Sequence, residues 1–211
     1  MDNLSIKLKT ELEYLHSKIG GKNQRIPTQS DLEGITQPNA IKALQFMAPY
    51  RAIYEKLEIE GLPINDHEAF RCALNQFNLK TVDDVEQFFD SGDIIEIYDM
   101  NLVQMYHNLT FYLYCSYDIL QLATTPLYQL YTRDAESNAA IVKKIDEVLK
   151  DPNRRTVKFT VPEHYLKETK IKTPARFKIN FKYISPLLNE QGEAVAVVTT
   201  NHCTPTELHA L

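Results

Sequence analysis

The chain has 211 residues, of which 44% are hydrophobic and 24% charged, and its formal net charge is −5 at pH 7. This length suits one domain with a flanking region or two small domains, and the composition is that of a globular protein with material for a core. The negative charge argues against direct nucleic-acid binding. No apolar run approaches the roughly 20 residues of a membrane-spanning helix.

Three cysteines, Cys72, Cys115 and Cys203, are an odd number without CxxC spacing. They therefore predict neither a disulfide framework nor a zinc site. Lys7 and Glu11 interrupt the apolar character that a secretory signal would need near the N-terminus. We expect a reducing, cytoplasmic location in which each cysteine is a buried thiol.

Residues 1–91 are predicted to form an N-terminal helical region. Apolar residues recur at three- and four-residue steps from Leu4 to Ile19, which makes one apolar stripe along a helix. A second helix is expected to begin at a cap on Asn39 and to break or kink at Pro49. A third helix begins at Asp66.

A short fourth helix is expected after Thr81, which has the spacing of a capping box with Asp84. The pattern changes after Gly92, where residues 93–101 are rich in β-branched and aromatic side chains and predict a strand. Residues 138–151 return to helical spacing. This change of period places a domain boundary at about residue 91.

Three further segments, 156–161, 176–184 and 193–200, alternate apolar and polar residues. Strict alternation indicates strands with one buried face, and it favours antiparallel over parallel pairing. We therefore expect a second domain at residues 92–204, and a tail or the start of a linker at 205–211.

The sequence carries none of the common phosphate-binding, zinc-protease or nucleophile-elbow motifs. His202 and Cys203 are a poor nucleophile–base pair, because neighbours on a strand point to opposite faces. His107 is a candidate haem or metal ligand and Cys115 a candidate redox or adduct site, but an ordinary polar residue and a core thiol are the favoured interpretations. We do not expect an enzyme.

The segment 93–122 keeps a characteristic spacing of polar and aromatic residues. An Asn is followed three residues on by Phe, then by a residue pair ending in Tyr, a polar residue and a leucine-rich helix. The residues with this spacing are Asn108, Phe111, Ser116, Tyr117, Asp118 and Leu122. Taken as a unit, residues 93–203 resemble a PAS domain, a sensory fold common in bacterial signalling proteins.

Later features agree with this resemblance. Arg133-Asp134 stands where many PAS domains have an Asp, and residues 187–195 resemble the turn that joins their last two strands. Ser116 departs from the Gly that is usual there, so the turn is expected to differ if that position needs a positive φ. The end of the chain also departs from the family, which implies either a sensor region cut from a longer protein or a protein that signals through contacts alone.

The resemblance implies an α+β fold in which a five-stranded antiparallel sheet, with helices on one side, encloses a cavity after the all-helical N-terminal region. Aromatic and apolar side chains are the candidates for lining it: Tyr106, Phe111, Tyr114, Tyr117, Tyr128, Phe159, Phe177, Ile179, Phe181, Tyr183 and Val197. The alternative is that they simply fill the core. The Asn-Cys-Arg-Phe box of flavin photosensors is absent, and the resemblance leaves any cofactor unknown.

The resemblance also implies a function. We expect a sensory or regulatory module of a bacterial signalling or transcription-regulating protein, which binds a small molecule or a partner and relays the change to an output domain outside the chain. The stripe from Leu4 to Ile19 suggests a homodimer through the N-terminal helices. The alternative is a ligand-free interaction or dimerisation module with a filled core.

Overall fold

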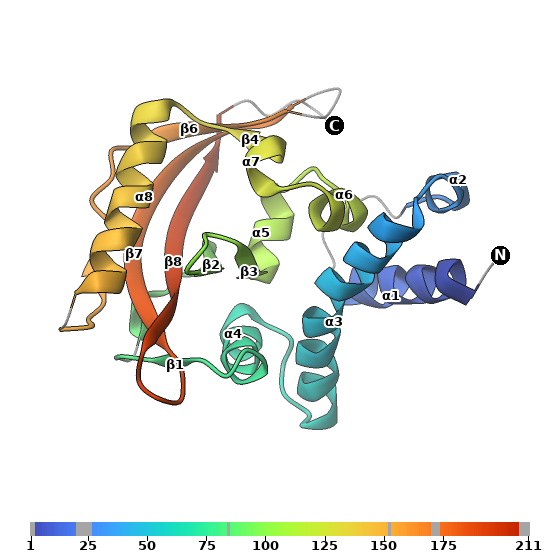
Figure 1. Cartoon of the computed structure of the whole chain (residues 1–211), viewed down its shortest axis with the longest axis horizontal. Helices are drawn as coiled ribbons and strands as arrows, with labels where there is room; N and C mark the ends of the chain where they lie inside the picture. The colour runs from blue at the N-terminus through green and yellow to red at the C-terminus, as the bar shows by residue number, and fades with distance from the viewer. Residues whose placement is uncertain (1–2, 20–26, 84, 152, 170–173, 207–211) are drawn as a thin grey trace.

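The structure is a computed structural model that describes residues 3–19, 27–83, 85–151, 153–169 and 174–206 (Figure 1). It is an α+β fold. A helical layer formed by the N-terminal residues lies beside an antiparallel sheet, and helix α8 runs along one face of that sheet (Figure 1). None of the described helices combines the length and the apolar character that crossing a bilayer requires.

The N-terminal layer contains four α-helices. They are α1 (Asn3–Ile19), α2 (Gln29–Glu33), α3 (Gln37–Ile59) and α4 (Asp66–Gln76). The apolar stripe of α1 is buried and α1 packs against α3, which confirms the predicted helix. The stripe is therefore used within the chain, and a homodimer through the N-terminal helices stays a prediction.

Helix α3 begins earlier than predicted and continues past Pro49. Its N-cap is Thr36 rather than Asn39, and it runs for 23 residues with Pro49 inside it. Of the predicted break or kink at Pro49, the break is therefore wrong, and a kink stays a prediction. Burial of the residues around the proline, Met47, Tyr50 and Ile53 among them, offsets the hydrogen bond that the ring removes.

The short helix expected after Thr81 is the 3₁₀-helix η1 (Val85–Phe88). Asp84, the other half of the expected capping box, lies outside the described residues. A two-residue strand precedes this helix, so the region up to residue 91 is not all helical. That strand pairs Lys80 with Leu188 of the sheet, and it joins the N-terminal region to the sheet across the predicted boundary.

The sheet has the order β3-β2-β8-β7-β6-β4, all pairs are antiparallel, and β1 and β5 also pair with β7. Its strands are β1 (Lys80–Thr81), β2 (Asp93–Asp99), β3 (Gln104–His107), β4 (Tyr131–Thr132), β5 (Val157–Lys158), β6 (His164–Glu168), β7 (Arg176–Leu188) and β8 (Ala194–Pro205). The five longer strands form the predicted antiparallel sheet, and the two-residue strands β1, β4 and β5 add to it.

The strand predicted at 156–161 is only partly formed. Pairing stops after Lys158, and the neighbour of β7 further along is β6, where His164 pairs with Ile179. Pro162 lies between the two segments and has no N–H to continue a ladder. Strand β6 escaped prediction because only its first and last residues are buried.

Four helices follow β3: α5 (Leu109–Tyr114), α6 (Ile119–Thr124), α7 (Leu127–Leu130) and α8 (Ala135–Lys150). Helix α8 is capped by the Asp134 side chain and buries Ile141, Ile145 and Val148, as its periodicity predicts. Helix α6 contacts α3, so the C-terminal helices meet the N-terminal layer.

Asn108 forms the predicted strand-to-helix transition. Its Oδ1 accepts from the backbone N–H of Phe111 at 3.3 Å as the N-cap of α5, and from the N–H of Ile95 at 3.1 Å. Its Nδ2 donates to the Asp93 carbonyl at 2.8 Å. One buried side chain therefore fixes the start of α5 against β2.

Ser116 fits its turn without a glycine. Its φ is not among the positive values of the described residues, and its N–H donates to the buried Glu168 carboxylate at 2.8 Å. The other oxygen of Glu168 accepts from the N–H of Ala175 at 3.0 Å. The departure from the family residue therefore causes no backbone strain.

Candidate functional site

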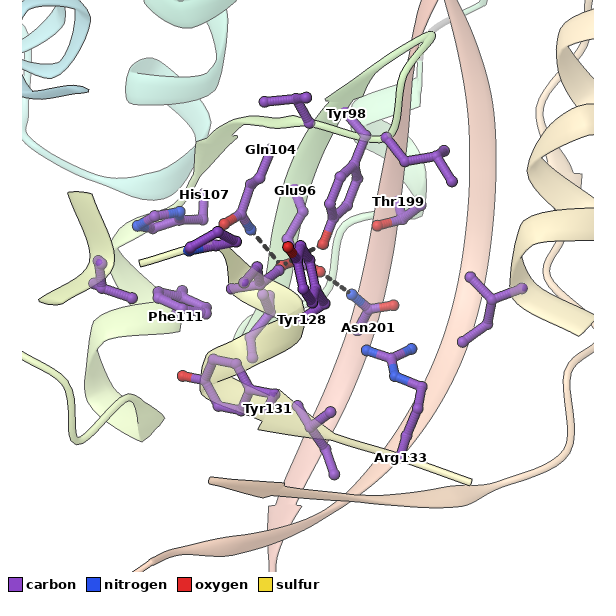
Figure 2. Close-up of a pocket in the computed structure, with 18 of the residues that line it drawn as sticks. Glu96, Tyr98, Gln104, His107, Phe111, Tyr128, Tyr131, Arg133, Thr199 and Asn201 are labelled. Atoms are coloured by element: carbon purple, nitrogen blue, oxygen red, sulfur yellow. Dashed lines mark hydrogen bonds between the residues drawn. The ribbon is translucent and has the colours of Figure 1, made fainter. Parts of the chain in front are cut away.

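A pocket of about 880 Å³ lies between the sheet and the helices that cover it (Figure 2). The sheet contributes residues from β2, β3, β6, β7 and β8, the helices α5 to α8 form the opposite wall, and α3 adds Lys42 and Phe46. Much of the wall is apolar: Ile94, Phe111, Leu122, Leu127, Ile141, Ile145, Leu166, Ile179 and Phe181.

The sheet wall also carries a row of polar residues. His107 on β3 pairs with Glu96 on β2, and Glu96 pairs with Thr199 on β8. Paired residues of antiparallel strands project from the same face, so all three side chains lie on the pocket side. Asn201, two residues beyond Thr199, lies on that side as well and lines the pocket.

Glu96 is the centre of a hydrogen-bonded cluster. One carboxylate oxygen accepts from the Tyr98 hydroxyl at 3.0 Å and from Gln104 Nε2 at 2.7 Å, and the other accepts from Asn201 Nδ2 at 2.7 Å (Figure 2). Burial raises the pKa of Glu96, and these hydrogen bonds and the positive charge of Arg133 partly offset that effect. Three donors on one carboxylate favour its ionised form.

Two polar atoms beside this cluster have no partner. Asn201 is 3% exposed and Thr199 is 1% exposed, and neither Asn201 Oδ1 nor Thr199 Oγ1 has a hydrogen bond among the described residues. The carboxylate of Glu96 fixes the orientation of the Asn201 amide, because the NH₂ group must face it. Asn201 Oδ1 is therefore a free acceptor beside Glu96.

His107 connects the pocket to the N-terminal layer. It is fully buried, its backbone N–H donates to the Tyr50 hydroxyl at 3.0 Å, and its Nδ1 lies 3.2 Å from the same hydroxyl. Burial lowers the pKa of His107 to about 3, so the ring is neutral. We assign the Tyr50 proton to Nδ1, which leaves a proton on Nε2, a donor without a partner among the described residues.

His107 and Cys115 are both buried. In the part of the chain that the structure describes, no group of three or more His, Cys, Asp or Glu side chains is placed to hold a metal ion. Burial raises the pKa of the Cys115 thiol to about 12, and the Tyr131 hydroxyl donates to its sulfur at 3.3 Å. Such a thiol stays protonated at neutral pH.

Arg133 supplies a positive charge to the pocket. Its guanidinium lies 6.0 Å from the centroid of the Phe181 ring, and Figure 2 shows it directed toward Asn201. It makes no ion pair with any described carboxylate, Glu96 included. The pocket therefore contains a buried carboxylate, Glu96, and a guanidinium, Arg133, that form no ion pair with each other.

Four of the eleven predicted lining residues line this pocket: Phe111, Tyr128, Ile179 and Phe181. Three of the others, Tyr106, Phe159 and Val197, are buried in the core. Tyr106 stacks on Tyr50 with ring centroids 5.9 Å apart, and Phe159 packs against Phe181 at 4.5 Å. Val197 is fully buried without reaching the pocket.

Three further candidates lie elsewhere. The Tyr117 hydroxyl donates to the Leu130 carbonyl, and Tyr114 packs edge-on against Phe177 at 6.3 Å. Tyr183 contacts Phe88, because the pairing of β7 with β8 shifts between Phe181 and Tyr183. This β-bulge breaks the alternation from which Tyr183 was predicted to face the pocket.

Sequence reasoning missed the polar wall. Its one available signal is Glu96, an acidic residue in the middle of a strand that is otherwise apolar and buried. Gln104, Arg133, Thr199 and Asn201 are ordinary in sequence and become a site only through strand pairing and helix placement. A buried charge inside a strand is a strong pointer to such a site.

No protein-family model matches the chain, and no curated protein matches its sequence. Two solved structures show a distant likeness. The light-state dimer of the fungal blue-light photoreceptor Vivid is 16% identical with a TM-score of 0.37, over 54% of this chain and 78% of that chain. An RNA-binding light-oxygen-voltage receptor is 12% identical with a TM-score of 0.35, over 93% of this chain and 59% of that chain.

Values this low carry no argument about family or function. What defines the chain is its own architecture: an antiparallel sheet, helices over one face, a pocket between them and Asn108 at the strand-to-helix transition. These features make an α+β domain with an N-terminal helical layer.

Proposed function

We propose that the chain is a PAS-type sensory or regulatory module that binds a small molecule in this pocket. The observation that carries the proposal is the set of buried polar atoms without partners on the pocket wall: His107 Nε2, Thr199 Oγ1 and Asn201 Oδ1. Such an atom costs roughly 1–3 kcal/mol when it has no hydrogen bond. A pocket of about 880 Å³ with convergent polar groups is typical of a ligand site.

The route of the signal in this proposal is helix α3. Lys42 and Phe46 line the pocket, and Tyr50 of the same helix is hydrogen-bonded to His107. A ligand would thus contact both the sheet and the N-terminal layer, and the layer would pass the change to an output domain or a partner protein. A bacterial signalling or transcription-regulating protein is the setting that the PAS resemblance implies.

The rest of the proposal concerns the cellular location, the enzymatic activity and the oligomeric state of the chain. We propose a cytoplasmic location, in agreement with three free cysteines, and a module without enzymatic activity, in agreement with the lack of catalytic motifs in the sequence. A homodimer through the N-terminal helices remains part of the proposal, and because α3 covers the α1 stripe, the contact would use other faces of these helices.

A ligand-free interaction module is the second candidate. Met100, Val103 and Tyr128 are exposed beside or at the pocket rim, where they offer an apolar surface to another protein. This candidate predicts that the pocket stays empty and that changes at the rim alter partner binding without altering the response to metabolites.

The first experiment is native mass spectrometry of the purified chain, with a visible absorbance spectrum and a thermal-shift screen of metabolites. A sensor shows a co-purified species or a ligand-dependent rise in Tm. Ala123→Phe on α6 would fill the pocket and remove this response, whereas Ala139→Phe on the exposed face of α8 is the matched control. No bound species and no shift in the unaltered chain would count against the proposal.

A further inference from the structure

We propose that the pocket is built for a zwitterion, an organic molecule with an ammonium group, a carboxylate and an apolar body. The inference rests on the proposed function and deepens it, because it names the class of ligand. It comes from two unmet needs of opposite sign in one cavity, one for a hydrogen-bond donor with positive charge and one for an anion.

The need for a cationic donor lies at Glu96. Its carboxylate is buried, and beside it Asn201 Oδ1 is fixed as an acceptor without a donor. Thr199, in register with Glu96 across β2 and β8, adds a hydroxyl oxygen without a partner. An ammonium group carries three N–H donors and one positive charge, which matches one carboxylate and two neutral acceptors.

The need for an anion lies at Arg133. Its guanidinium lines the same pocket and has no ion-pair partner among the described carboxylates. A guanidinium binds a carboxylate through two parallel hydrogen bonds, and exclusion of water strengthens the pair. The exposed Lys42 adds a second positive charge to the lining.

The two needs exclude simpler ligands. A plain carboxylate would satisfy Arg133 and leave Asn201 Oδ1 and Thr199 Oγ1 unmet, while a plain amine would bring a second positive charge beside Arg133. A zwitterion satisfies both ends and adds no net charge to a buried space, where an unpaired charge is costly.

The rest of the wall selects the body of the ligand. Ile141, Ile145 and Leu166 line the pocket together with the aromatic Phe111 and Phe181. A volume of about 880 Å³ exceeds the needs of a small amino acid and suits a large apolar side chain or two of them. His107 Nε2–H remains as a donor for a carbonyl oxygen of the ligand. Free aromatic amino acids and apolar dipeptides share this chemistry.

The test is calorimetric titration of the full chain with L-phenylalanine and with the dipeptide Phe-Leu. Two truncated probes accompany them: 3-phenylpropanoate, which lacks the ammonium group, and phenylalaninamide, which lacks the carboxylate. We expect at least one zwitterion to bind at least about tenfold more tightly than both truncated probes. The dipeptide as the tighter ligand would identify peptides as the source, and phenylalanine would identify free amino acids.

Variants assign the two ends of the ligand. Arg133→Gln should weaken binding of the zwitterion by about tenfold or more without weakening binding of phenylalaninamide, and Glu96→Gln should do the same without weakening binding of 3-phenylpropanoate. Arg176→Gln is the control, since Arg176 is exposed and does not line the pocket. If Glu96→Gln does not fold, Arg133→Gln and the four probes on the unaltered chain still decide the matter.

Equal binding of the zwitterion and either truncated probe would overturn the inference, and so would no binding of any zwitterion. The proposed function would survive that result if native mass spectrometry found a different species whose binding Ala123→Phe abolishes. An empty pocket and no thermal shift with any metabolite would overturn both.

Discussion

The N-terminal layer and the sheet wall of the pocket are both buried, but they differ in the polarity of their buried side chains. Helices α1 and α3 pack against each other and bury mostly apolar side chains, Leu8, Leu12 and Leu57 among them, while partly exposed ion pairs such as Arg51–Glu11 also join the two helices. The sheet wall buries Glu96, Thr199 and Asn201, two of which have atoms without partners. Apolar packing stabilises the fold, whereas unpaired polar atoms lower stability. Under the proposed function, this difference means that the polar wall serves binding rather than folding.

The largest effect is expected in the apolar layer. Leu8→Ala removes a fully buried side chain between α1 and its neighbours and should lower the free energy of unfolding by about 3 kcal/mol. Ile6→Ala on the same helix, where the side chain is 52% exposed, should change it by less than about 0.5 kcal/mol. Urea unfolding followed by circular dichroism measures both. Equal effects would show that α1 does not pack as described.

Asn108 is the exception to the comparison, because both polar atoms of its buried side chain are hydrogen-bonded. Asn108→Ala should cost about 2–3 kcal/mol, since it removes the cap of α5 and leaves the N–H of Ile95 and the carbonyl of Asp93 unpaired. Asn65→Ala, at the cap of α4, loses a single hydrogen bond and should cost about 1 kcal/mol. A smaller loss at Asn108 than at Asn65, measured by the same unfolding experiment, would contradict this account.

His107 should make the free energy of unfolding depend on pH. Its pKa is about 3 in the folded chain and about 6.5 when unfolded, so only the unfolded chain gains its proton as the pH falls from 7 to 5. The free energy of unfolding should drop by about 2 kcal/mol over that range through this residue. The raised pKa of Glu96 acts in the opposite sense and favours folding at low pH.

The comparison of the unaltered chain with His107→Phe isolates the histidine contribution, because both proteins contain Glu96. In thermal or urea unfolding, the drop between pH 7 and 5 should be smaller in the variant by about 2 kcal/mol, because the variant keeps only the contribution of His164, whose pKa burial also lowers. The same pH dependence in both proteins would show that His107 is protonated in the fold.

Thr199→Val should have the smallest effect on stability and the most informative one. Valine has the same shape and removes an unpaired hydroxyl, so the free energy of unfolding without ligand should rise or change by less than about 1 kcal/mol. Binding of the zwitterion should weaken at the same time. A clear loss of stability would show that the hydroxyl serves the fold, and the two regions would then differ less than we infer.

Much of the fold was determined by sequence patterns acting over short distances. The apolar period of α1 and α8, the alternation in β7 and β8 and the spacing around Asn108 all lie within single elements or neighbouring ones. Helical and strand periods depend on which face of one element is buried, and the order of apolar and polar residues along the sequence reveals that face directly.

The tertiary structure alone decided the site. Glu96, Arg133 and Asn201 are far apart in the chain, and they meet because β8 pairs with β2 and because the segment around Arg133 crosses the pocket. The bulge between Phe181 and Tyr183 directs Tyr183, a predicted lining residue, away from the pocket. Packing of α3 against α1 and α6 stabilises the helix on both sides of Pro49. Each outcome depends on contacts between distant segments, and the free energy of those contacts exceeds that of the local conformational preferences.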